Sequence, residues 1–233
     1  MTGTVVAGER EKFDALAGRW WDPDGPMRPL HRMNPLRTGW IARRLGGVSG
    51  KAILDVGCGA GLASEAFARM GATVTGVDAA GAALAAARAH AEAGSLVIDY
   101  REGGPEDLLA DGQKFDAVVA LEVIEHVENR PDFLAALAAL AKPGAPIFLS
   151  TLNRTARSFL LAKLGAEYLL RLLPVGTHDW RMFISPGELG AALRPVGYRI
   201  ADLAGMSMSP LTGNWRESRD LGVNYLAMAV PAR

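Results

Sequence analysis

The sequence has almost no cysteine and no excess of charge of either sign. Cys58 is the only cysteine among 233 residues, which excludes an intramolecular disulfide and a cysteine-based structural zinc site. The 25 basic side chains are balanced by 25 acidic ones. Bulk positive charge is therefore not available to hold nucleic acid, and we expect no nucleic-acid partner.

Long apolar runs are lacking as well. No stretch approaches the roughly 20 apolar residues that span a bilayer. Residues 1–13 lack the basic start and apolar core of a signal peptide, so we expect a cytoplasmic protein. Hydrophobic residues still make up 49% of the chain and charged residues 21%. This composition excludes disorder for most of the chain and indicates one domain over residues 1–233.

The middle of the chain, residues 51–151, alternates short apolar strands with helices. Strands are predicted at 52–56, 73–77, 96–100, 115–121 and 146–150, with helices at 62–70, 81–93 and 131–141. Such alternation is typical of a doubly wound α/β fold, in which helices cover both faces of a mostly parallel sheet. We expect this segment to bind a cofactor.

The flanks of this core have a different character. Residues 1–50 contain a short helix, a proline-rich aromatic segment and a helix that begins at Pro35, and we interpret them as a lid. Trp20 and Trp21 in this segment belong either to the core or to the wall of a ligand site. Residues 152–184 are predicted to form a helical insertion after the fifth strand. Residues 185–233 then supply a closing helix and two strands, at 198–203 and 223–230.

The most informative motif is ILDVGCGAGLAS, residues 53–64, which joins the first strand to the next helix. Glycines at 57, 59 and 61 let the turn adopt positive φ and let a ligand approach the backbone closely. The dinucleotide fingerprint would place its third glycine at position 62, where Leu62 stands. Asp55 would also repel a pyrophosphate. Both features argue against a nicotinamide dehydrogenase.

Asp78 stands at the tip of the second strand, where an acidic residue can bind both hydroxyls of a ribose. Together with Asp55 and the glycine loop it indicates an adenosine that carries a cationic group and no phosphates. S-adenosylmethionine has this chemistry.

A second group of polar residues, Glu122, Glu125 and His126, follows the fourth strand. Positions i, i+3 and i+4 of a helical turn share one face, so we expect the three side chains to converge beside the cofactor's reactive end. Two carboxylates and an imidazole suit Mg²⁺ or another divalent ion, which would ionise a phenol. His126 could instead act as a general base without metal, or the group could be structural.

Five segments carry a resemblance that covers nearly the whole chain from Phe13 onward. In chain order they are RWWDPDGPMRPLHRMNPLR, LDVGCGAGL, LEVIEHV, STLNRTARSFLLAKLGAEYLLRLLPVGTHDW and VNYL. The chain resembles the ubiquinone biosynthesis O-methyltransferase family, which belongs to the class I S-adenosylmethionine-dependent methyltransferases. The resemblance implies methyl transfer to ring hydroxyls of two polyprenylated precursors, a 2-polyprenyl-6-hydroxyphenol and 3-demethylubiquinol.

The resemblance also assigns roles to single residues. It implies cofactor contacts for Arg37, Gly57, Gly59, Gly61, Asp78 and Leu121. It implies a divalent metal at Glu122, Glu125 and His126. From the chemistry of the cluster we take His126 and Glu122 as the catalytic residues. Glu106 and Asp107 match the region that holds the adenine amino group, and His178 and Asp179 match a family segment to which we assign no role.

The segment from Arg154 to Leu173 is apolar with a basic edge, which is typical of helices that lie on anionic membranes. It could equally be a core helix with a solvated edge. Because a polyprenyl substrate is insoluble in water, we expect a peripheral protein at the inner face of the membrane, next to other ubiquinone-synthesis enzymes. A C-methyltransferase, a methyltransferase of free catechols, and a non-enzymatic subunit that anchors a quinone-synthesis complex remain as alternatives.

Overall fold

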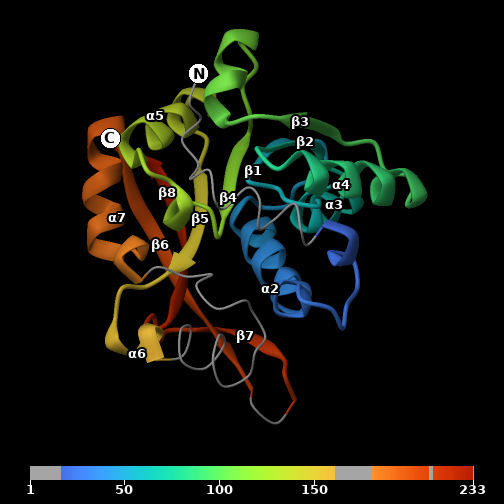
Figure 1. Ribbon diagram of the computed structural model, residues 1–233. Coiled ribbons are helices and arrows are strands. Elements are labelled where there is room, and N and C mark those ends of the chain that lie inside the picture. Colours follow the sequence, from blue (N-terminus) through green and yellow to red (C-terminus); the bar gives the residue numbers. More distant parts are fainter. Residues whose placement is uncertain (1–16, 161–179, 210–211, 233) are drawn as a thin grey trace.

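The computed structural model describes residues 17–160, 180–209 and 212–232. Its centre is an eight-stranded sheet with the strand order β3-β2-β1-β4-β5-β8-β6-β7 (Figure 1). The strands are β1 (Ala52–Val56), β2 (Thr73–Asp78), β3 (Asp99–Glu102), β4 (Ala117–Leu121), β5 (Ile147–Leu152), β6 (Tyr198–Met208), β7 (Trp215–Ser218) and β8 (Asn224–Pro231). The first five are parallel, whereas β8 is antiparallel to both β5 and β6. The predicted doubly wound α/β class is confirmed.

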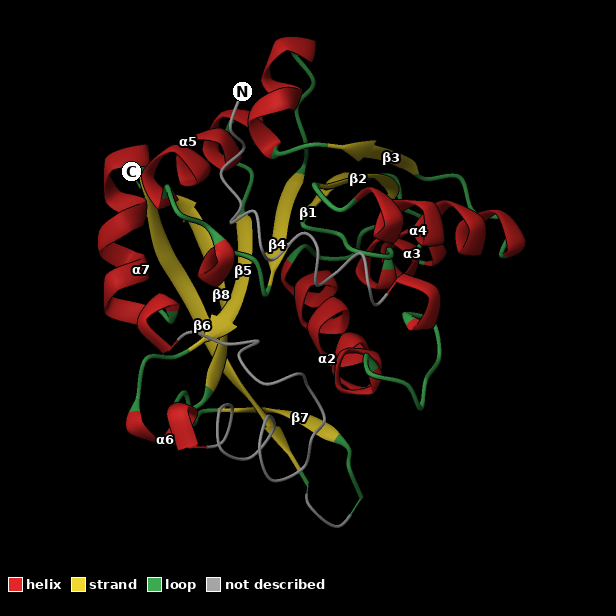
Figure 2. Cartoon of the chain, viewed as in Figure 1, coloured by secondary structure: helices red, strands yellow, loops and turns green. Residues whose placement is uncertain are grey.

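Helices cover both faces of this sheet (Figure 2). On one face lie α2 (Arg28–Arg44) and α3 (Leu62–Arg69), which bury Trp40, Ile41 and Phe67 against the strands. On the other face lie α5 (Arg130–Leu140) and α7 (Pro186–Leu193). The alanine-rich α4 (Gly81–Ala93) packs beside β3. The short helices are η1 (Ala17–Arg19), η2 (Pro105–Asp111), η3 (Ile124–His126), α6 (Ala156–Ser158), η5 (Trp180–Met182) and η6 (Arg194–Val196).

The central strands are apolar throughout because both of their faces are covered. All five residues of β4 are buried, as are four of the five in β1. Continuous apolar runs of this kind are characteristic of parallel sheets between two layers of helices. The carboxyl ends of β1, β2, β4 and β5 meet at one edge, and the chain turns in opposite directions after β1 and β4. Ligands of doubly wound sheets bind at such a switch point.

Three sequence-based expectations were wrong in detail. The third strand, expected at 96–100, is β3 at Asp99–Glu102. The helix expected from Pro35 begins at Arg28, and Pro29 takes the first-turn position, where the fixed φ of proline is favourable. Pro35 lies inside α2 and removes one helical hydrogen bond. β6 also extends to Met208 and pairs with β7, a strand that the sequence pattern did not predict. Most of the predicted helical segment after β5, residues 161–179, lies outside the described residues.

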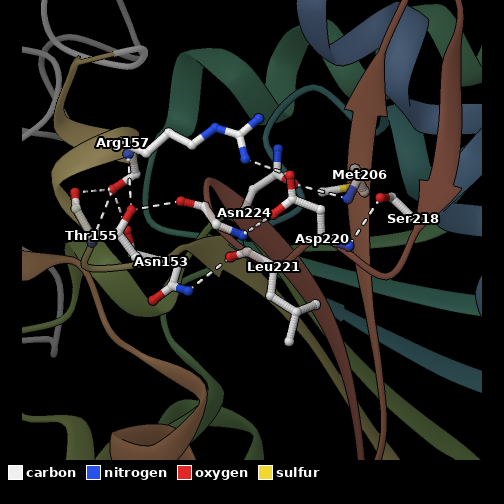
Figure 3. A network of polar contacts seen from close by, with 10 residues as sticks. Asn153, Thr155, Arg157, Met206, Ser218, Asp220, Leu221 and Asn224 are labelled. Atoms are coloured by element: carbon white, nitrogen blue, oxygen red, sulfur yellow. Dashed lines mark hydrogen bonds and ion pairs between the residues drawn. The ribbon is translucent and has the colours of Figure 1, made fainter.

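A polar network fixes the described start of that segment (Figure 3). Asn153 donates its side-chain amide to the carbonyl of Leu221 at 2.8 Å, and the Thr155 hydroxyl donates to the carbonyl of Gly222 at 2.6 Å. Arg157 forms an ion pair with Asp220. The chain that leaves β5 is therefore tied to the loop between β7 and β8.

Candidate active site

The glycine loop lies at the carboxyl end of β1, directly before α3. Gly57 has φ 67° and Gly59 has φ 54°, which favour glycine. A Cβ atom at Gly57 would lie 2.4 Å from Cγ2 of Val123, and one at Gly59 would lie 2.5 Å from Cζ2 of Trp20. Gly61 is equally restricted, since its Cβ would meet the Tyr100 hydroxyl at 2.1 Å. Neighbouring side chains thus lie directly against the backbone of this loop, and a Cβ atom at any of the three glycines would collide with one of them.

Asp78 is half-buried at the tip of β2 and reaches back to the glycine loop. Its Oδ2 accepts a hydrogen bond from the Gly59 amide at 2.7 Å, and its Oδ1 accepts one from the Ala80 amide at 2.8 Å. Asp78 therefore shapes the loop and places negative charge beside it.

Arg37 is buried in α2 with a side chain that has unused donor capacity. Arg37 is 4% exposed. Its Nη2 donates to Oδ1 of Asn34 over a long 3.4 Å, and its Nε has no hydrogen-bond partner among the described residues. Burial lowers the pKa of the guanidinium, and the nearby carboxylates of Glu122 and Asp55 oppose that shift. Such a donor suits a ligand carboxylate.

Asp55 completes this charged group from β1. Burial raises the pKa of its carboxyl to about 6, although the Ser64 hydroxyl donates to Oδ2 at 2.6 Å and Arg37 lies nearby. The cation of Arg37 therefore lies within electrostatic range of two carboxylates, those of Asp55 in β1 and Glu122 directly after β4.

The aromatic segment before α2 forms a wall along the glycine loop. Trp20 is 5% exposed, and its ring occupies the space beside Gly59. Trp21 donates its Nε1 proton to the carbonyl of Ala60 at 3.0 Å and stacks on His90, with ring centroids 3.4 Å apart. Trp20 also belongs to a small apolar cluster with Met27 and Leu62, so the wall is packed as well as placed against the loop.

Glu122 follows β4 in a strained conformation. Its φ of 57° is left-handed, a state that costs a non-glycine residue on the order of 1–3 kcal/mol. Its amide donates to the carbonyl and to the hydroxyl of Ser150, at 3.0 Å and 3.1 Å, and the same hydroxyl donates to Oε1 of Glu122 at 2.6 Å. Leu121, 9% exposed, precedes it at the end of β4. Strain at such a position is a feature of functional sites.

Glu125 lies in a different environment. It is 3% exposed, and the Thr151 hydroxyl donates to its Oε2 at 2.9 Å. Burial raises the pKa of its carboxyl to about 7, the charge of Glu122 adds to that shift, and His126 opposes it. The three residues are thus within electrostatic range of one another.

The helical turn that was expected to place Glu122, Glu125 and His126 on one face is absent. Only Ile124–His126 are helical, as a 3-10 turn, because Glu122 is left-handed and lies outside it. In the described parts of the chain, no group of three or more His, Cys, Asp or Glu side chains is arranged to hold a metal ion. The donor arrangement here therefore does not fit a metal.

The remaining predicted residues lie at the edges of the site. The Asp107 side chain accepts from the Gly104 amide at 2.9 Å and caps η2, whereas Glu106 is half-buried beside it. His178 and Asp179 lie outside the described residues. Sequence analysis missed Ser150, Thr151 and His90. The hydroxyl pair was visible as Ser-Thr at the end of a predicted strand, but nothing in the sequence showed which carboxylates it would bind.

The buried Glu125 carboxyl predicts a pH-dependent stability. A pKa raised from 4.5 to about 7 stabilises the fold at low pH, and this contribution is lost as the pH rises through 7. Glu125→Gln stays neutral and keeps an acceptor for Thr151. Relative to the unmodified protein, its free energy of unfolding should rise by up to about 3 kcal/mol between pH 5 and pH 8. Urea denaturation at both pH values measures this, and a constant difference would contradict the buried charge.

The comparisons with known proteins agree with this geometry. Residues 54–149 match the model of a methyltransferase domain family. The magnesium protoporphyrin IX methyltransferase of Synechocystis PCC 6803, solved with bound SAH, superposes with a TM-score of 0.71 at 22% identity, over 96% of this chain and 98% of that one. At that identity the similarity establishes the class I methyltransferase fold.

Full-length relatives are more informative. The ubiquinone biosynthesis O-methyltransferase of Azorhizobium caulinodans is 45% identical over 98% of this chain and 95% of its own length. The protein of the same name from Bordetella parapertussis is 49% identical over 95% of this chain and 92% of its own length. Identity at this level over nearly the whole length confirms the resemblance seen in the sequence, and the chain belongs to the ubiquinone biosynthesis O-methyltransferase family.

Proposed function

We propose that this protein is an S-adenosylmethionine-dependent O-methyltransferase that methylates ring hydroxyls of polyprenylated ubiquinone precursors. Its substrates would be a 2-polyprenyl-6-hydroxyphenol and 3-demethylubiquinol. The observation that carries the proposal is the convergence of the glycine loop, Asp78, buried Arg37 and strained Glu122 at one sheet edge, in a chain of this family. The relatives' names favour O-methylation over C-methylation.

The chain's residues fit S-adenosylmethionine, which would supply a methyl group activated by the positive charge on sulfur. Arg37 would bind the cofactor's carboxylate through the unused donor capacity of its guanidinium. Asp78 would accept from the ribose hydroxyls. The glycine loop would approach the amino-acid portion, and Leu121 would give an apolar contact.

The protein's own contribution to the reaction is deprotonation, orientation and exclusion of water. His126, half-exposed beside Glu125, would take the proton of the ring hydroxyl. The hydroxyl oxygen freed of that proton would be the nucleophile for the methyl group that the cofactor would supply, and the proton would stay on His126. Glu122 would keep negative charge on the Arg37 side of the site, and the wall of Trp20 would keep water out.

Asp78→Ala tests the cofactor site. We expect S-adenosylmethionine affinity to fall by about 1–3 kcal/mol, because the ribose hydroxyls would lose a charged acceptor. Calorimetry measures the affinity, and circular dichroism checks the fold. Asp99→Ala, which removes a carboxylate at the opposite end of the adjacent strand β3, is the matched control and should leave binding unchanged. Equal affinities for both variants would remove Asp78 from the site.

His126→Asn tests the base. We expect kcat to fall by roughly 10²- to 10⁴-fold while S-adenosylmethionine affinity is retained. A single-turnover assay with a catechol that carries a short prenyl chain measures the loss. Turnover at the original rate would favour a non-enzymatic or different catalytic role for this turn.

The family resemblance implies a divalent ion at Glu122, Glu125 and His126, whereas the arrangement of these side chains does not fit one. The same assay on chelator-treated protein, with and without added Mg²⁺, tests it. Because the carboxylates are held by separate hydroxyls, we expect full turnover without the ion. Loss of turnover that Mg²⁺ restores would show that the site rearranges to bind metal.

We also propose contact with an anionic membrane surface and with other enzymes of ubiquinone synthesis, since the substrate carries a polyprenyl tail. No helix among the described residues is long and apolar enough to cross a membrane. Leu160, the last residue of the described range 17–160, is 54% exposed. Arg154 and Arg157 form ion pairs with Glu188 and Asp220, so reversing their charge would also break contacts within the protein. Lys163 and Arg171 are therefore the better positions at which to test membrane binding.

Lys163→Glu combined with Arg171→Glu should lower binding to vesicles rich in anionic lipid. Each basic side chain near such a surface contributes about 1 kcal/mol and is screened by salt. Arg194→Glu with Arg199→Glu makes the same charge change at exposed positions elsewhere and should have little effect. Vesicle sedimentation measures binding, and equal binding by all three proteins would contradict a membrane role for residues 154–173.

A further inference from the structure

The end of β5 carries two neighbouring hydroxyls, those of Ser150 and Thr151, and both residues are fully buried. Successive side chains of a strand point to opposite faces of the sheet. The residues before them show the same alternation, since Phe148 packs with Trp40 on the α2 face and Leu149 packs with α5 on the other. Ser150 therefore faces α2, and Thr151 faces α5 and α7.

Each hydroxyl binds one carboxylate of the turn after β4. Ser150 donates to Oε1 of Glu122 at 2.6 Å, and Thr151 donates to Oε2 of Glu125 at 2.9 Å. The two carboxylates are only three residues apart, yet they are drawn to opposite faces of one strand. Glu122 then lies on the side of Arg37, whose guanidinium feels its charge, and Glu125 lies on the side of Arg130.

Ser150 holds Glu122 at two levels that can be separated. Its carbonyl accepts from the Glu122 amide at 3.0 Å, which supports the left-handed backbone, and its hydroxyl anchors the carboxylate. Removing the hydroxyl takes away the second acceptor of the Glu122 amide but keeps the bond to the carbonyl. Such a change therefore frees the side chain of Glu122 and leaves the main backbone contact of the turn in place.

We propose that Ser150 is a positioning residue for methyl transfer, which fixes the Glu122 carboxylate on the cofactor side of β5. The hydrogen bond holds the carboxylate, with its negative charge, beside Arg37 before the reaction starts. A free side chain would first have to lose conformational entropy to reach that position. This inference rests on the proposed function, because it assigns Glu122 to the reaction.

Ser150→Ala and Glu122→Gln, alone and combined, test the pair in the short-chain catechol assay. Ser150→Ala should lower kcat about tenfold or more with little change in KM, since a hydrogen bond to a charged group is lost. The same substitution should have almost no further effect in the Glu122→Gln background. Ser150→Thr keeps a hydroxyl and should restore most of kcat.

Thr151→Val is the matched control, because it removes the adjacent hydroxyl on the other face. It should change kcat less than twofold. If Ser150→Ala does not fold, Ser150→Cys replaces it, since the thiol is a weak donor of similar size. Equal losses of kcat with and without Glu122→Gln, or an unchanged kcat in Ser150→Ala, would overturn the proposal. An unmodified protein that transfers no methyl group would instead contradict the proposed function.

Discussion

The buried charge of Arg37 is the constraint on which the site depends. A guanidinium that is 4% exposed is stable only where acceptors or anions lie close, because removal from water penalises the charged form. Asp55 on β1 and Glu122 after β4 supply that negative charge. The chain turns in opposite directions after these two strands, and Arg37 of α2 places its positive charge between the two carboxylates. Helix α2 and the switch point of the sheet are thus parts of one electrostatic arrangement.

Strand β5 fixes the positions of the two carboxylates in the turn after β4. In an undistorted helical turn Glu122 and Glu125 would share a face, with mutual repulsion and a natural place for a cation. The left-handed Glu122 and the alternating hydroxyls of Ser150 and Thr151 separate them. One carboxylate remains near Arg37, whereas the other becomes a buried group with a pKa near neutrality. The strain at Glu122 is offset by three hydrogen bonds from a single serine.

The features that were predictable from sequence are those set by local pattern. The alternating strands and helices, the glycine loop and Asp78 follow from residue type and spacing within short segments. Two other features depend on partners distant in sequence. The start of α2 depends on packing that outweighs the hydrogen bond lost at Pro35. The conformation of Glu122 depends on Ser150, which lies 28 residues later, so the Glu-x-x-Glu-His spacing could only suggest a helical face that the fold does not form.

The aromatic wall links these observations. Trp20 fills the space that a side chain at position 59 would take, so the glycine serves the fit of the wall as well as the turn. Burial at this sheet edge lowers the local dielectric, which strengthens the interactions of Arg37 with Asp55 and Glu122. Exclusion of water also raises the free energy of any one of these charges that is left unpaired. The segment before α2 therefore acts on the site through its packing against the glycine loop.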